Sequence, residues 1–102
     1  MDFRAGQDWR VREDAKAICL LQFTAPFTGG TSVIVPAGEI LIVESDPLPH
    51  ARGVGFRPKR YAELMKSVVD AKDLANSKFA GYSLVIKFEE VARCCMIESG
   101  AR

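Results

Sequence analysis

The sequence predicts a mainly β domain of the α+β class with one inserted helix, and three observations support this prediction. Residues 17–24 and 82–88 alternate with a period of two, as β-strands do. Two short β-branched runs, at 32–35 and 39–44, flank a Pro-Ala-Gly turn. Apolar residues recur at helical spacing between 58 and 70. We therefore expect antiparallel strands, with the helix inserted before the last two of them.

The length of the chain fits one domain. Its 102 residues fall short of the roughly 200 that two hydrophobic cores need. With 48% hydrophobic and 26% charged residues, the composition is that of an ordinary globular protein. The formal net charge of +1 argues against a globally basic nucleic-acid binder but leaves a local basic patch open. We take 1–102 as one domain, with an N-terminal arm at 1–16 and a core at 17–98.

Hydropathy and cysteine content favour the cytoplasm. No stretch approaches the 18 or so apolar residues of a membrane span. The first residues mix acids and bases, and no apolar run of the kind found in a signal peptide follows them. Three cysteines, two of them adjacent at Cys94 and Cys95, form no spaced disulfide framework. We predict a cytoplasmic protein with no membrane partner.

The first predicted strand begins at Ala17. From there to Phe23 both faces of the strand are mainly apolar, which is typical of a strand buried on both sides. A loop with Pro and Gly follows at 25–31. The β-branched runs at 32–35 and 39–44 then belong to one bent or hairpinned segment.

The second half of the chain contains the helix and the last strands. A long connection at 46–53 holds two prolines, which favour extended backbone without ladder hydrogen bonds. The helix is expected from about Pro58, whose φ is already helical, to Asp70, with an extension to Leu74 left open. Its apolar stripe consists of Tyr61, Leu64, Met65 and Val68.

Two further segments follow the helix. The alternation over 82–88 predicts a half-buried strand. Residues 91–97 fit either a final edge strand or a helical turn, and the pattern leaves both open.

The segment Thr31–Val43, with its Val-Pro-Ala-Gly-Glu-Ile-Leu core, resembles the second segment of small Src-homology-3-like barrels. The resemblance covers residues 17–43 and, more loosely, 82–97, and it implies a small antiparallel barrel with the helix at about 58–70 as an insertion. The chain lacks the aromatic-rich loop by which signalling members bind proline-rich peptides, so their function does not carry over. The chain also looks like small bacterial proteins without an assigned activity.

Residues able to support catalysis or metal binding are few. His50 is the only histidine, so any Ser-His or Cys-His catalysis would need it, and we expect it to be an exposed loop residue. The cysteines form no C-x₂-C pair with which His50 could complete a zinc site. Of Cys94 and Cys95, one should face the core and one the solvent, as neighbours on a strand do. We expect no enzyme, no cofactor and no metal.

Two features of the sequence suggest binding. Four cations, Arg52, Arg57, Lys59 and Arg60, occur within nine residues with no acid among them, and Phe56 and Tyr61 are interleaved. Such a pattern can track phosphates and stack bases. A third aromatic residue, Phe27, sits in the Gly/Pro loop, where it either folds back over the mouth of the barrel, which we favour, or anchors a partner.

We predict a non-enzymatic module that binds another protein through its long loops. The candidate binding residues are Phe27, His50, Arg52, Phe56, Arg57, Lys59 and Arg60. The alternative is a small nucleic-acid-associated protein that uses the basic segment 52–60.

Overall fold

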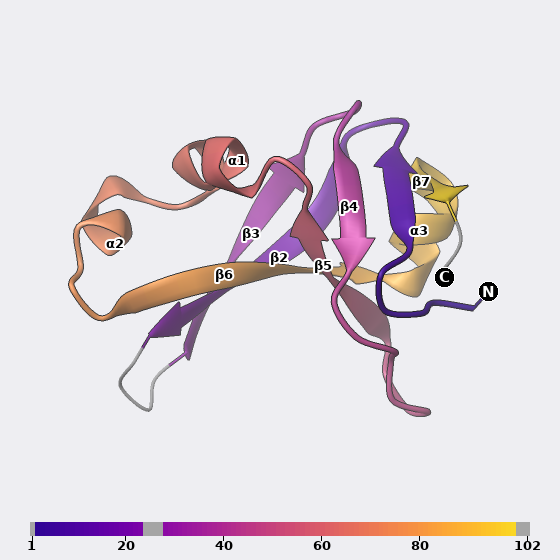
Figure 1. Cartoon of the computed structure of the whole chain (residues 1–102), viewed down its shortest axis with the longest axis horizontal. Helices are drawn as coiled ribbons and strands as arrows, with labels where there is room; N and C mark the ends of the chain where they lie inside the picture. Colours follow the sequence, from indigo (N-terminus) through magenta and orange to yellow (C-terminus); the bar gives the residue numbers. More distant parts are fainter. Residues whose placement is uncertain (1, 24–27, 100–102) are drawn as a thin grey trace.

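A computed structural model describes residues 2–23 and 28–99 of the chain, which contain seven strands and three short helices (Figure 1). The strands are β1 (Asp8–Val11), β2 (Ala15–Phe23), β3 (Thr28–Val35), β4 (Ile40–Val43), β5 (Gly53–Pro58), β6 (Phe79–Lys87) and β7 (Cys95–Ser99). The helices are α1 (Tyr61–Val68), α2 (Ala71–Leu74) and α3 (Phe88–Cys94). The mainly β prediction is confirmed.

All strands belong to one antiparallel sheet in the order β3-β2-β6-β5-β4-β1-β7. The long strands β2, β3 and β6 extend to one side in Figure 1, and the shorter strands stand across them. Within the described residues β3 and β7 are the two edges, so the sheet is open. The closed barrel that the resemblance implied is therefore not confirmed.

The core lies on the inner face of this bent sheet. Neighbouring strands contribute fully buried side chains at matched positions, because Phe56 of β5 pairs with Val43 of β4 on one side and with Leu84 of β6 on the other. Helix α1 adds the buried Leu64, and the ring of Tyr61 stacks on Tyr82 of β6 with 4.7 Å between centroids. No helix among the described residues is long and apolar enough to cross a membrane.

Residues 1–16, expected as an arm, contribute a strand to the sheet. Strand β1 pairs with β4 and β7, and its residues alternate between half-buried and buried. Trp9 is 6% exposed and its ring lies 5.0 Å from that of Phe3. A four-residue strand between charged neighbours is too short to show a period, and for this reason the sequence pattern missed it.

The inserted helix is confirmed, with different ends. Pro58 does not begin the helix but closes β5, where it pairs with Leu41. Helix α1 begins three residues later at Tyr61 and ends at Val68, because Val69 and Asp70 have extended backbone. The short α2 is a separate turn of helix, not an extension of α1.

The runs at 32–35 and 39–44 do not form a hairpin. Strand β3 pairs with β2, whereas β4 lies between β5 and β1. The intervening turn instead carries the chain to the other half of the sheet, and Gly38 makes it possible with a φ of +98°. Both interpretations of 91–97 hold in part, because α3 ends at Cys94 and β7 begins at Cys95.

Candidate interaction surface

The four cations of segment 52–60 do not form one patch. Arg52 precedes β5 and Arg60 follows it, and a strand of six residues is about 20 Å long. The guanidinium of Arg57 lies over the ring of Tyr61, 4.7 Å from its centroid. The ammonium nitrogen of Lys59 is 3.9 Å from a carboxylate oxygen of Asp8.

Arg60 is the most strongly engaged of these cations. It donates to the buried carboxylate of Glu39 through two nitrogens and to Glu63 at 2.6 Å. The pKa of Arg60 is raised, mainly because its guanidinium donates hydrogen bonds to the carboxylate of Glu39. Intramolecular acids thus occupy the position that a phosphate would take.

The other predicted binding residues do not gather around these cations. Phe56 is 0% exposed and packs edge-on against Phe3, so it cannot stack on a base in the folded protein. His50 is exposed in the connection between β4 and β5, as expected. Phe27 lies outside the described residues. Within residues 2–23 and 28–99, no group of three or more His, Cys, Asp or Glu side chains could hold a metal.

We expect no measurable binding of duplex or single-stranded nucleic acid, even at low salt. Three of the four cations face an acid or a ring, and the aromatic between them is buried. Fluorescence anisotropy of labelled oligonucleotides measures this directly. Binding with a log–log salt slope of about −3 to −4, lost when the four cations are replaced by Gln, would contradict the expectation and support the nucleic-acid alternative.

The cysteines are free and all three are buried. The prediction that one of Cys94 and Cys95 faces the solvent is wrong, because the chain changes from helix to strand between them and the strand alternation does not apply. Cys94 lies at the end of α3, where its Sγ is 3.6 Å from the carbonyl oxygen of Asp14. Burial raises the pKa of Cys19 and of Cys95 to about 11.

We expect all three thiols of the native protein to react slowly with a disulfide reagent at pH 8. Burial restricts access, and the raised pKa values leave little thiolate, which is the reactive form. Thiol titration before and after addition of denaturant measures the difference, and three equivalents should react only after unfolding. Fast reaction of even one thiol in the native protein would contradict the burial.

Glu90 of α3 joins this helix to β2. Its carboxylate accepts hydrogen bonds from the backbone N–H of Lys16 at 2.8 Å and from two nitrogens of Arg93 at 2.8 and 3.2 Å. The hydrogen bonds from Arg93, followed by that from Lys16, lower the pKa of Glu90 from 4.5 to about 2. The backbone N–H of Lys16 is 74 residues away in the chain, so the local sequence pattern does not reveal this bond.

This lowered pKa predicts a pH dependence of stability. A carboxyl group whose pKa falls on folding stabilises the protein above its unfolded pKa of about 4.5, and the contribution is lost as the pH falls toward about 2. We expect the melting temperature of the Glu90→Gln variant to fall less over this window than that of the native protein. The neighbouring exposed Glu89→Gln is the matched control and should follow the native curve. Equal slopes for all three proteins would contradict the bond network around Glu90.

We did not predict from the sequence that one side of β2 carries exposed apolar side chains. On β2 the residues Ala17, Cys19 and Leu21 face the core, whereas Ile18 and Leu20 are 44% and 39% exposed. The prediction of a strand buried on both sides is therefore wrong for the chain folded alone.

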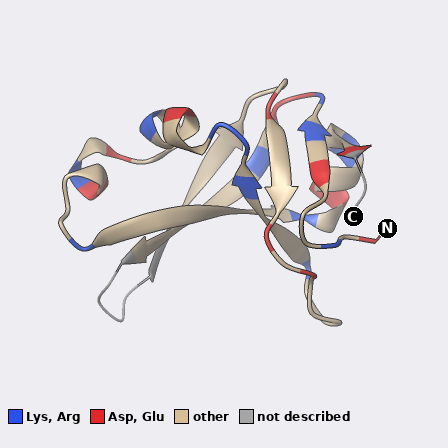
Figure 2. Cartoon of the chain, viewed as in Figure 1, with Lys and Arg blue, Asp and Glu red and all other residues tan. Residues whose placement is uncertain are grey.

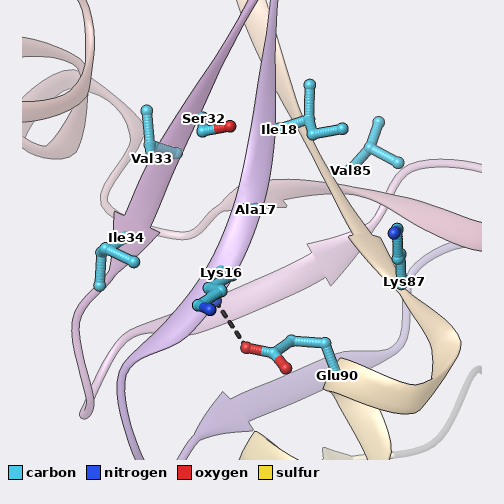
Figure 3. A pocket seen from close by; sticks show the side chains of 9 residues that line it. All are labelled: Lys16, Ala17, Ile18, Ser32, Val33, Ile34, Val85, Lys87 and Glu90. Carbon is cyan, nitrogen blue, oxygen red and sulfur yellow. Dashed lines mark hydrogen bonds between the residues drawn. The ribbon is translucent and has the colours of Figure 1, made fainter.

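We define the outer face as the exposed side of β2, β3 and β6. Ile34 of β3 is 53% exposed on this side, and Val85 of β6 pairs with Ile18. Figure 3 shows these side chains around a groove, with the hydrogen bond between Lys16 and Glu90 at one end. Lys87 borders the same end. The apolar pattern on both sides of β2 was the feature of the sequence that pointed to this face.

The edge beside this face is unprotected. Strand β3 runs for eight residues without a charged side chain or a proline, and its register with β2 is unbroken from Val35 to Thr28. Its ribbon in Figure 2 accordingly shows no charged residue. Natural proteins blunt exposed edges with charges, prolines or bulges, because an open edge can pair with another chain.

The opposite edge is protected in this way. In β7 the carboxylate of Glu98 is held by Arg10 at 2.8 Å, and the register between β1 and β7 shifts at Asp8 and Trp9. The two edges of the sheet are therefore not equivalent, and β3 is the one open to a partner strand.

No family model, no curated protein and no solved structure matches the chain. An apolar face beside an open strand edge can bind a polypeptide, since main-chain groups along the edge and side chains in the groove would engage it together.

Proposed function

We propose that the protein is a non-enzymatic interaction module that binds another polypeptide through the outer face and the edge of β3. The observation that supports this proposal is the two-sided apolar pattern of β2 combined with the exposure of Ile18 and Leu20. Strands with such a pattern are normally covered on both sides. A bound polypeptide would supply the missing cover.

Strand addition is the mode of binding that this surface suits. An extended segment would pair with the main-chain groups of β3, and its side chains on the outer side would lie beside Ile34 and reach Leu20 and Ile18 over Gly30. The main-chain bonds would give affinity and the side chains would give specificity. An arrangement of this kind needs no catalytic group.

The cytoplasm is the proposed location, and the three free, buried thiols support it because they need no oxidising compartment. The relationship to Src-homology-3-like barrels stays a prediction, and the interaction proposal does not depend on it.

Selection of extended peptides from a random library tests this function. We expect the selected peptides to bind the native protein, to shift backbone NMR signals along β2 and β3, and to lose about tenfold or more in affinity in Ile18→Asp. Ile97→Asp is the matched control, since Ile97 is the same residue type with 45% exposure against 44% for Ile18, but on the blunted edge β7.

The outcome that overturns the proposal is equally specific. Peptides whose binding is unchanged in Ile18→Asp, with NMR shifts away from β2 and β3, would assign binding to another surface. Circular dichroism of both variants shows whether the fold is retained. We expect both to fold, because both positions are exposed.

A further inference from the structure

We infer that the polypeptide on this edge is a second copy of the chain, paired through β3 in antiparallel fashion about a two-fold axis at Ser32. The inference rests on the proposed function, because it names the partner of the same surface. It joins two seven-stranded sheets into one continuous sheet.

The charge of the edge supports a second copy. Strand β3 has no charged side chain between Thr28 and Val35, so two identical strands can approach without repulsion between like charges. Because the edge strand is uncharged, it cannot select an acidic or a basic foreign strand by its charge.

The side chains on the outer side of β3 are complementary to each other. With the two-fold axis at Ser32, each Ile34 lies opposite Gly30 of the second copy. Gly30 has no side chain, and a Cβ built there would lie 3.4 Å from Leu20 and 3.6 Å from Ile18. The space over Gly30 is therefore bordered by exposed apolar side chains, and Ile34 of the second copy can fill it.

This contact occurs twice, as a symmetric interface requires. The projecting Ile34 and the receiving Gly30 are equally far from Ser32 along one strand, so each copy offers both halves of the contact. Pairing in this register brings Ile34 of one copy against Leu20 and Ile18 of the other across Gly30, and these are the three most exposed apolar residues of the outer face. The two-sided apolar pattern of β2 then has its explanation.

The cations of the face do not oppose this arrangement. Lys16 pairs with Ile34 across β2 and β3, so it lies toward one end of the groove. The two-fold axis moves Lys16 of the second copy to the opposite end of the joined face. The two ammonium groups therefore stay apart.

Disulfide trapping tests the register directly. In Ser32→Cys the new thiols of the two copies lie opposite each other across the two-fold axis. Directly opposite Cα atoms in antiparallel pairs are about 4.5–5.5 Å apart, which a disulfide can span. With oxidised glutathione as the oxidant, we expect a covalent dimer of twice 11.2 kDa on a non-reducing gel. The native thiols are buried and should not contribute.

Matched variants separate this register from random collision. Ile34→Cys alone should not form covalent dimers. Position 34 of one copy faces position 30 of the other, so the two thiols are four residues apart along the strand, or about 13 Å. A mixture of Ile34→Cys with Gly30→Cys should form them. The exposed Ala62→Cys on α1 gives the rate of collisional crosslinking.

Sedimentation of the native protein completes the test. We expect a dimer that dissociates in Ile34→Lys and persists in Ile97→Lys. A monomer at the highest soluble concentration, with Ser32→Cys crosslinking no faster than Ala62→Cys, would overturn the inference. If selected peptides still bind through Ile18 in that case, the interaction module stands and only its partner changes. If neither a dimer nor peptide binding is found, the inference and the proposed function both fail.

Discussion

Replacing Phe56 by Ala is expected to lower the free energy of unfolding by about 3–5 kcal/mol. Phe56 is 0% exposed and lies in the middle of β5, between Val43 of β4 and Leu84 of β6. Its ring also meets Phe3 edge-on, with 6.4 Å between centroids. A domain of this size has roughly 5–15 kcal/mol of stability in total, so the loss is a large part of it. Urea unfolding followed by circular dichroism measures the change.

The control for this variant is Phe56→Leu. Leucine keeps part of the volume and all of the apolar character, so we expect a clearly smaller loss than for Ala. A loss below about 1 kcal/mol in Phe56→Ala would show that the ring is not packed in the core. An unpacked ring could stack on a base, so this result would also reopen the nucleic-acid alternative.

The sequence predicted the long, regular elements best. Strand β6 shows a clear alternation, and Tyr82, Leu84 and Ile86 are buried as that alternation requires. Strand β1 and the start of α1 were misjudged for local reasons. A four-residue strand is too short for a period, and a proline that could begin a helix instead ends a strand that pairs with β4.

The fate of the candidate binding residues was harder to predict from the sequence, because it depends on partners that are distant in the chain. Arg60 is neutralised by Glu39, which is 21 residues away in the chain, and a local count of cations cannot reveal this. The burial of Phe56 depends in the same way on strands that flank it in space. In contrast, the apolar pattern of β2 was visible from the start. Its consequence was not, since the sequence does not show that the chain itself covers only one side.

Gly53 and Gly55 of β5 should respond in opposite ways to the same change to Ala. A Cβ at Gly53 would lie 2.7 Å from the carbonyl oxygen of Ile86 and 3.2 Å from the Cα of Lys87, and both are backbone atoms of β6 that cannot turn away. We expect Gly53→Ala to lower the free energy of unfolding by about 2–3 kcal/mol, because β5 must move away from β6.

At Gly55 the nearest atom to such a Cβ is a carboxylate oxygen of Glu44 at 4.0 Å, which is ordinary contact. Gly55→Ala should therefore be neutral or raise the free energy of unfolding by about 0.5 kcal/mol, since alanine loses less backbone entropy on folding. Urea unfolding of the two variants side by side measures the difference in their free energies of unfolding. Hydrogen exchange of the amides that form hydrogen bonds between β5 and β6 should accelerate only in Gly53→Ala. Equal losses at both positions would mean that the alternation of β5 is shifted. Since Phe56 is placed in the core by that same alternation, the burial that removes it from the surface would then be wrong as well.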